Sequence, residues 1–299
     1  MQKRVFVLFG GVLALALAMA GLVVSDIVAR DRLLHTEPSE YAPIVVFEQY
    51  GERCMNFNEI ESQGRQSCFQ LDDPDRMVFE YTRMMTSALF VRPEPQNVLI
   101  IGLGGGTLPM ALHKLLPAAT IDTVELDPAV VKVAQRYFGY QIGPRQRVYV
   151  EDGREFIERA GREGRTYDMV MLDAFDVDYI PAHLMTMEFL EQVRDILAPG
   201  GVVVANSFAQ SSLYERESAT YATVFGEFLN LRAGLEGNRV IIAVAGELPD
   251  MADLRRHAAK LAERLKPFGI DADQALEAFA VYHEPPGRVQ VLRDAPRPQ

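Results

Sequence analysis

Short apolar runs that alternate with amphipathic stretches fill the middle of this 299-residue chain. The runs are NVLIIG (97–102), IDTVEL (121–126), RVYVED (147–152), YDMVMLD (167–173) and GVVVANS (201–207). Such runs are typical of strands that are buried on both faces, and the stretches between them have the period of a helix. Their alternation predicts an α/β fold with a doubly wound, mostly parallel sheet. We expect late strands at VIIAVAG (240–246) and VQVL (289–292), with helices over 213–233 and 251–265 around them.

A small antiparallel β-unit is predicted before this domain. Residues 44–57 and 65–71 are rich in β-branched and aromatic side chains and flank a polar turn, as in a hairpin. Cys54 and Cys68 are equally far from the centre of that turn, so we expect their Cα atoms within about 7 Å, close enough for a disulfide. Two buried thiols in a reducing compartment are the alternative.

The predicted organisation has three parts: an anchor or signal segment with its linker (1–36), the β-hairpin unit (37–72) and the α/β domain (73–299). Asp73, followed by Pro74 and Asp75, has the pattern of a helix start, and we expect a helix from there to about Phe90.

The amino terminus carries an uncharged, mostly apolar segment, residues 5–25, that follows Lys3 and Arg4. As a helix it is roughly 31 Å long, enough to span a bilayer. We expect a single anchor in a bacterial inner membrane. The alternative is a signal peptide cut after Ala18-Met19-Ala20, which would give a periplasmic or secreted protein. Basic residues on both sides of the segment leave open which side of the membrane the α/β domain occupies.

The composition excludes several classes of partner. Thirty basic and 41 acidic residues give a net charge of −11, which argues against nucleic acid and is compatible with a cationic ligand. Two cysteines exclude a four-cysteine zinc site, and the five histidines are not spaced as a helical metal pair. We therefore predict no metal.

The turn after the first strand, Gly102-Leu103-Gly104-Gly105-Gly106, predicts a nucleotide site because glycines there let a helix amino terminus face the crevice above the sheet. Glu125 closes the next strand, where a carboxylate can accept hydrogen bonds from ribose hydroxyls. Asp152 and Gly153 close the third. There an acid can accept from the exocyclic amine of adenine, although a helix cap is the alternative.

The nucleotide is expected to carry no phosphate, because no Lys or Arg stands in the glycine loop and a P-loop lysine is absent from it. An adenosyl group that carries a sulfonium fits an acidic site without a basic cradle. The fourth strand ends in Asp173, followed by Asp176 and Asp178. Deprotonating an amine nucleophile at neutral pH needs an acceptor, and we assign that role to Asp173. His183, close by in sequence, is either a participant in proton transfer or a structural hydrogen-bonding residue.

Over residues 44–296 the sequence resembles the spermidine synthase (polyamine aminopropyltransferase) family. The matching segments are FEYTRMM (79–85), VLIIGLGGG (98–106), VELD (124–127), EDGREF (151–156), YDMVMLDAFD (167–176), the stretch 186–207 and, more weakly, VLRDAPRP near the end. The resemblance implies a Rossmann-like, class I methyltransferase-type sheet. It also implies that Asp173 accepts the proton, that Asp176 and Tyr81 bind the polyamine, and that Glu125 and Asp152 bind ribose and adenine.

The implied activity is transfer of an aminopropyl group from decarboxylated S-adenosylmethionine to a polyamine amine. The expected partners are a small cationic amine as substrate and the membrane, through the N-terminal segment. One departure from the family matters most: the family's loop reads G-G-G-D-G-G, and its aspartate, which holds the amine of the donor, falls on Gly105. Thr82 and Arg83 also differ from the residues that usually follow the tyrosine. Two alternatives therefore stay open: a methyltransferase that uses S-adenosylmethionine, and a membrane-tethered adenosyl-binding protein without turnover. The acceptor and a homodimeric state also stay open.

Overall fold

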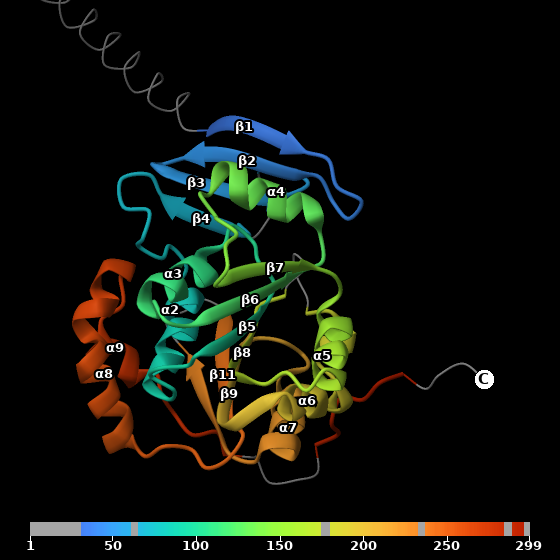
Figure 1. Ribbon diagram of the computed structural model, residues 1–299, viewed down its shortest axis with the longest axis vertical. Coiled ribbons are helices and arrows are strands. Elements are labelled where there is room, and N and C mark those ends of the chain that lie inside the picture. Colours follow the sequence, from blue (N-terminus) through green and yellow to red (C-terminus); the bar gives the residue numbers. More distant parts are fainter. Residues whose placement is uncertain (1–30, 61–64, 175–179, 233–236, 284–288, 296–299) are drawn as a thin grey trace, which may run out of the picture.

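The computed structural model describes residues 31–60, 65–174, 180–232, 237–283 and 289–295. In this part of the chain, a seven-stranded sheet carries helices on both faces and a four-stranded sheet lies beside it (Figure 1). The strand order in the large sheet is β10-β11-β9-β8-β5-β6-β7. Strands β5 to β9 pair in parallel, and β11 and β10 add antiparallel strands at one edge. The predicted doubly wound, mostly parallel sheet is confirmed.

The elements of this α/β domain follow one another in the expected alternation. The strands are β5 (Asn97–Ile101), β6 (Thr120–Glu125), β7 (Gln146–Val150), β8 (Tyr167–Leu172), β9 (Leu197–Phe208), β10 (Phe228–Arg232) and β11 (Asn238–Val244). The helices are α2 (Glu80–Thr86), α3 (Thr107–Leu115), α4 (Pro128–Tyr137), α5 (Gly153–Arg162), α6 (Met187–Asp195), α7 (Tyr214–Phe225), α8 (Met251–Leu265) and α9 (Ala272–Glu277). Short 3₁₀ turns are η1 (Ser87–Phe90), η2 (Ala182–Leu184) and η3 (Lys266–Phe268).

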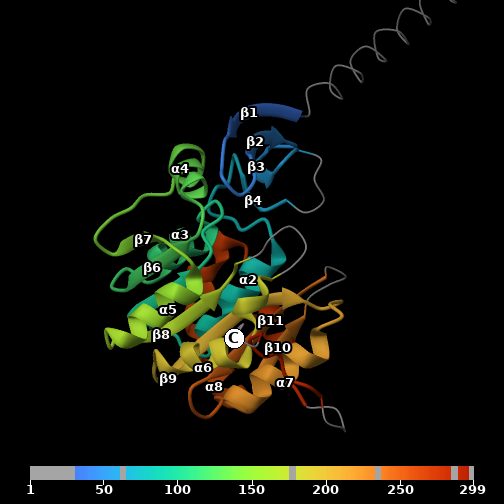
Figure 2. The ribbon, with the colours of Figure 1, turned by 90° about the vertical axis from the view of Figure 1, so that its right-hand side faces the viewer.

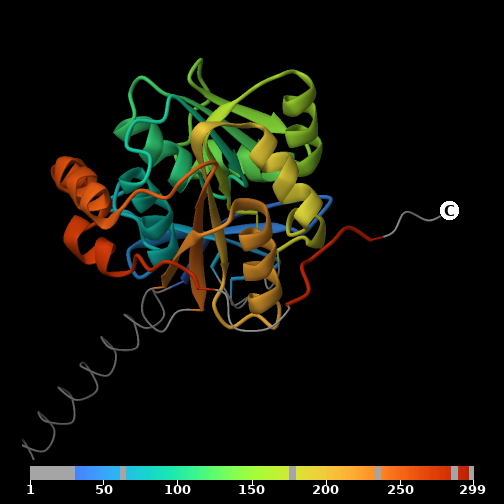
Figure 3. The same ribbon diagram turned by 90° about the horizontal axis from the view of Figure 1, so that it is seen from below.

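Strand β5 shows why the apolar runs form central strands. Val98 and Ile100 pack into the core beneath α2, α3, α8 and α9, whereas Leu99 and Ile101 pack beneath α5, α6 and α7. All four side chains are buried because successive residues of a strand point to opposite faces. The two helical layers lie on opposite sides of the sheet (Figures 1 and 3).

The small sheet is antiparallel, with the order β1 (Asp31–Glu37), β2 (Ile44–Gln49), β3 (Glu52–Phe57) and β4 (Ser67–Gln70). It packs on α4 and lies at one end of the molecule (Figure 2). Cys54 and Cys68 lie opposite each other on β3 and β4, with Cα atoms 4.1 Å apart, and form a disulfide. The predicted spacing of the two cysteines is confirmed.

The β-unit is larger than the predicted hairpin. Its first strand begins at Asp31, inside the segment 1–36 that was expected to be anchor and linker. The run 44–57 contains two strands instead of one, because Tyr50 and Gly51 adopt positive φ values of 51° and 81° and turn the chain back.

Two helix predictions need correction. The helix expected over 213–233 ends at Phe225, where Gly226 has a φ of 79°, and strand β10 follows. The apolar residues of β10 therefore belong to a strand. The helix expected from Asp73 begins at Glu80, so Asp73 is not its cap.

The predicted late strand 289–292 is wrong, because these residues pair with no strand of the described chain and lie in an extended segment outside the sheet. The predicted strand in 240–246 is confirmed as part of β11, and the helix 251–265 is confirmed as α8. The apolar segment 5–25 lies outside the described residues. Among the residues that are described, no helix has the length and apolar character to span a bilayer.

Candidate active site

The glycine loop joins β5 to α3. Gly102, Gly104 and Gly106 all have positive φ values, of 100°, 52° and 84°, a conformation that glycine adopts without strain. A Cβ at Gly102 would lie 2.3 Å from the carbonyl oxygen of Asp173, so the loop passes against the end of β8. The three glycines therefore bring the loop backbone to the edge of the sheet where Asp173 lies.

Gly105 is surrounded by side chains from two other parts of the fold. A Cβ at this position would lie 2.7 Å from Cδ1 of Phe138 and 2.7 Å from Oγ of Ser67. Ser67 belongs to β4 of the small sheet, and Phe138 directly follows α4. The small sheet thus closes the place on the loop where the family carries an aspartate.

Glu125 ends β6 and turns its carboxylate back toward the loop. Oε2 accepts a hydrogen bond from the amide of Leu103 (2.9 Å), and Oε1 accepts one from the amide of Asp127 (3.0 Å). Burial raises the pKa of Glu125, while these backbone hydrogen bonds act in the opposite direction. The carboxylate is therefore held in one orientation against the glycine loop, with lone pairs left for a hydroxyl donor.

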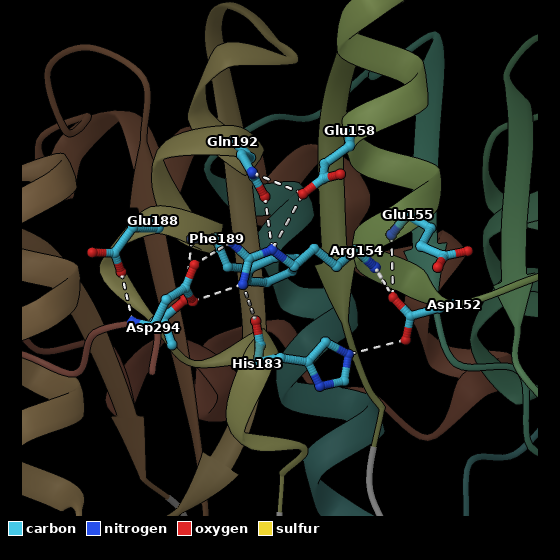
Figure 4. Close-up of polar contacts among 10 residues, drawn as sticks. Asp152, Arg154, Glu155, Glu158, His183, Glu188, Phe189, Gln192 and Asp294 are labelled. Carbon is cyan, nitrogen blue, oxygen red and sulfur yellow. Dashed lines mark hydrogen bonds and ion pairs between the residues drawn. The ribbon is translucent and has the colours of Figure 1, made fainter. Parts of the chain in front are cut away.

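Asp152 caps α5 and also contacts η2. Oδ1 accepts from the amides of Arg154 (2.9 Å) and Glu155 (3.1 Å), and Oδ2 lies 2.9 Å from Nε2 of His183 (Figure 4). The helix-cap interpretation of Asp152 is therefore correct as far as Oδ1 is concerned. A Cβ at Gly153 would lie 2.5 Å from the side chain of Ile101, so glycine allows α5 to start close to β5.

Asp173 follows β8, and its amide donates to the carbonyl of Ile101 (2.8 Å). Its Oδ1 accepts a hydrogen bond from Nδ2 of Asn206 (3.0 Å). Burial raises the pKa of Asp173 to about 7, and the hydrogen bond from Asn206 acts against that rise. Burial is the main cause that raises the pKa of Tyr81 well above its usual value, and the negative charge of Asp173 adds to the rise.

Asn206 is a residue that the sequence reasoning missed. It lies in β9, the strand beside β8, and its own Oδ1 accepts from Nδ2 of Asn238 on β11 (3.1 Å). That contact turns the amide nitrogen of Asn206 toward Asp173. The available signal was its place in the run GVVVANS, a polar residue near the end of a parallel strand, where open α/β sheets bind ligands.

A small cavity lies between the end of β8 and η2. Its lining is mostly apolar, with two polar side chains, and consists of Ile101, Leu172, Ala174, Ile180, Leu184, Met185, Ala205, Asn206, Glu217 and Tyr221. Glu217 is paired with the fully buried Arg239 (2.5 Å), so its charge is compensated inside the protein. This part of the site therefore presents an apolar wall next to Asp173.

The site residues come from neighbouring strands. The order β8-β5-β6-β7 places Asp173, the glycine loop, Glu125 and Asp152 side by side at the carboxyl edge of the sheet. Asp176, the predicted amine ligand, lies outside the described residues. The described residues contain one cluster with the ligand types of a metal site, and two of its members, Cys54 and Cys68, are joined in the disulfide.

The spermine/spermidine synthase domain matches residues 78–229. A polyamine aminopropyltransferase of Vibrio vulnificus is 44% identical over 248 residues, which are 82% of this chain and 83% of that protein.

Solved structures of related fold include a probable spermidine synthase from Corynebacterium glutamicum (TM-score 0.67, 21% identity, 88% of this chain and 97% of that one). Human methyltransferase-like protein 13, solved with SAH, has a TM-score of 0.59 and 27% identity, and the match covers 63% of this chain and 93% of that one. These solved structures share the fold of this chain, and the sequence matches include the residues of the candidate site. The chain therefore belongs to the spermine/spermidine synthase family.

Proposed function

We propose that this chain is a polyamine aminopropyltransferase, which transfers the aminopropyl group of decarboxylated S-adenosylmethionine to an amine of a polyamine. The observation that carries the proposal is Asp173 at the sheet edge: its carboxyl group has a pKa raised to about 7, and its backbone carbonyl lies against Gly102 of the glycine loop. A base whose pKa lies near the operating pH is suited to general base catalysis. The name of the Vibrio vulnificus relative supports the same activity.

The donor fits the described groups by its chemistry. Glu125 is oriented to accept from the ribose hydroxyls, and the glycine loop brings backbone rather than basic side chains to a ligand without phosphate. We assign Asp152 to the adenine amine, because its Oδ2 accepts from no amide of the described backbone and lies beside His183 at the start of α5. Metal ions have no assigned role in this proposal.

In the reaction, the neutral amine of the acceptor attacks the propyl carbon that is bound to the sulfonium. The new C–N bond forms as the C–S bond breaks, and the sulfur leaves with the bonding pair as the neutral thioether 5′-methylthioadenosine. Asp173 accepts the proton that the amine nitrogen must lose. The phenol of Tyr81 stays protonated, because burial and the charge of Asp173 raise its pKa, and we assign it to the acceptor as a hydrogen-bond donor. Asp176 remains our prediction for the site of a second ammonium group of the acceptor.

We keep methyl transfer from S-adenosylmethionine as the alternative to be tested, because of one position in the glycine loop. Gly105 carries no carboxylate for the donor amine, and Ser67 and Phe138 occupy the adjacent space. The purified protein should therefore be incubated with putrescine and each donor in turn, and the amine products identified by mass spectrometry. We expect an aminopropylated amine from the decarboxylated donor. A methylated amine from S-adenosylmethionine would support the alternative. Binding of both donors without any product would show a protein that binds without turnover.

We also propose that the apolar segment 5–25 anchors the protein in a bacterial inner membrane, with the small sheet on the oxidising side. The segment's length and the disulfide between the buried Cys54 and Cys68 support this placement. Both cysteines are buried in the folded protein, so cells should be lysed directly into denaturant that contains a maleimide and no reductant. We expect both cysteines to stay unlabelled. Labelling of both would contradict this placement and put the domain in the reducing cytosol.

A further inference from the structure

The extended segment 289–295, which we call the strap, is tied to α6 and α7 by its backbone. The carbonyl of Leu292 accepts from the amide of Met187 at the start of α6 (2.8 Å), and the amide of Leu292 donates to Oγ1 of Thr220 on α7 (2.9 Å). These contacts satisfy backbone groups of the strap without a strand partner. The strap therefore has a defined course past the amino end of α6.

Beyond Leu292 the strap reaches the adenine end of the proposed site. Asp294 donates its amide to Oε2 of Glu188 (3.0 Å) and directs its carboxylate at Arg154, in the first turn of α5 (Figure 4). Both carboxylate oxygens are used: Nη1 of Arg154 lies 2.7 Å from Oδ1, and Nη2 lies 2.6 Å from Oδ2. Such paired hydrogen bonds between guanidinium and carboxylate fix geometry as well as charge.

The guanidinium of Arg154 joins two walls of the site. Nη1 also donates to the backbone carbonyl of His183 in η2 (3.2 Å), and Nε donates to Oε1 of Gln192 on α6 (3.1 Å). The side chain of Arg154 is only 15% exposed, whereas that of Asp294 is 37% exposed. Arg154 also lies 3.5 Å from Oε1 of Glu158, a second carboxylate beside its Nε. Asp294 supplies the shorter, paired contacts at the outer side.

A closed ring of contacts results. Asp152 accepts from the amide of Arg154, the side chain of Arg154 donates to the carbonyl of His183, and the ring of His183 lies against Oδ2 of Asp152. This cycle of contacts sets the distance between the start of α5 and η2. Together they flank the carboxylate of Asp152, which we assign to the adenine amine. Loss of Asp294 removes both paired hydrogen bonds that hold Arg154 in this ring.

We propose that Asp294 is a positioning residue for the adenosyl donor, which acts through Arg154 to hold Asp152 and His183 around the adenine. The inference rests on the proposed function of Asp152. The contacts described for Asp294 are with Arg154 and Glu188, on the side of the site assigned to adenine, so its effect is expected on donor binding and not on proton transfer. The strap is thus part of the donor site, although it follows all the strands and helices of the sheet in the sequence.

The test compares Asp294→Ala and Asp294→Asn with the unchanged protein. We expect the KM for decarboxylated S-adenosylmethionine and the Kd for 5′-methylthioadenosine to rise about fivefold, with kcat unchanged. The matched control is Arg293→Gln, which removes the neighbouring strap ion pair with Glu188 but leaves Arg154 untouched. In this control, the KM for the donor and the Kd for 5′-methylthioadenosine should equal those of the unchanged protein.

A double-mutant cycle separates positioning from general loosening of the strap. If Asp294 acts through Arg154, Asp294→Ala should add nothing to the effect of Arg154→Ala on the Kd for 5′-methylthioadenosine. Equal Kd values for the unchanged protein and Asp294→Ala would overturn the strap proposal alone, as would additive effects in the cycle. If the unchanged protein itself does not bind 5′-methylthioadenosine, the proposed function fails, and the strap proposal fails with it.

Discussion

Replacement of Asp173 by asparagine is expected to lower kcat for aminopropyl transfer about a thousandfold, the size of effect typical for loss of a positioned general base. Asparagine keeps the volume of the side chain but cannot accept a proton from the attacking amine. The effect should appear in kcat, with little change in the Kd for 5′-methylthioadenosine, because Asp173 makes no assigned contact with the adenosyl group. Single-turnover kinetics and calorimetry on the same preparation measure both quantities. A variant with undiminished kcat would remove Asp173 from the mechanism.

The same assignment fixes the direction of the pH dependence. Asp173 acts as a base only when ionised, so the rate in the unchanged protein should rise with pH through about 7, where burial places its pKa. The hydrogen bond from Asn206 lowers that pKa, and Asn206→Leu should therefore move the midpoint of the rise to higher pH. A midpoint that stays in place, or moves to lower pH, would show that Asn206 does not act on the base.

Loss of Glu217 is expected to have the largest effect on folding. Its carboxylate pairs with Arg239 (2.5 Å) and accepts from Oγ of Ser207 (2.5 Å), and these three residues are buried. Glu217→Ala leaves the guanidinium of Arg239 inside the protein without its counter-charge, which should lower the free energy of unfolding by about 3–5 kcal/mol. Urea denaturation followed by circular dichroism measures this difference.

Two further variants test that explanation. Glu263→Ala removes the exposed ion pair with Lys266 and should leave the free energy of unfolding nearly unchanged, because solvent screens such a pair. The double replacement Glu217→Leu with Arg239→Met removes both charges and should recover most of the lost stability. If Glu217→Ala lowers the free energy of unfolding no more than the exposed control does, the uncompensated charge of Arg239 does not destabilise the protein, and the explanation is wrong.

The buried pair also bears on the site. The hydroxyl of Ser207 donates a hydrogen bond to Glu217. Ser207 directly follows Asn206, whose amide donates a hydrogen bond to Asp173. Glu217 additionally lines the cavity beside the end of β8. We therefore attribute the fixed position of Asn206 partly to this pair, which anchors the end of β9 from the opposite face of the sheet.

Local patterns failed where a choice between helix and strand depended on contacts elsewhere. Residues 228–232 are apolar enough for either structure, and pairing with β11 makes them a strand. The run 289–292 has the composition of a strand, yet the described edge strands β10 and β7 do not pair with it. The backbone amide of Met187 at the start of α6 and the side chain of Thr220 on α7 hold it instead. In each case the partner lies outside the segment, so no local period reports it.

The alternation of apolar runs and helical stretches was sufficient by itself to determine the parallel sheet and the common edge at which Gly102, Glu125, Asp152 and Asp173 lie. Parallel strands have their carboxyl ends at one edge, so a residue's place at the end of its run fixes its place in the fold. The tertiary structure alone decided that Ser67 and Phe138 close the space at Gly105, that Asn206 orients toward Asp173, and that Asp294 reaches Arg154. Asp294 and Arg154 are 140 positions apart. Contacts over such separations arise from the packing of whole elements, which leaves no periodic trace in the sequence around either residue.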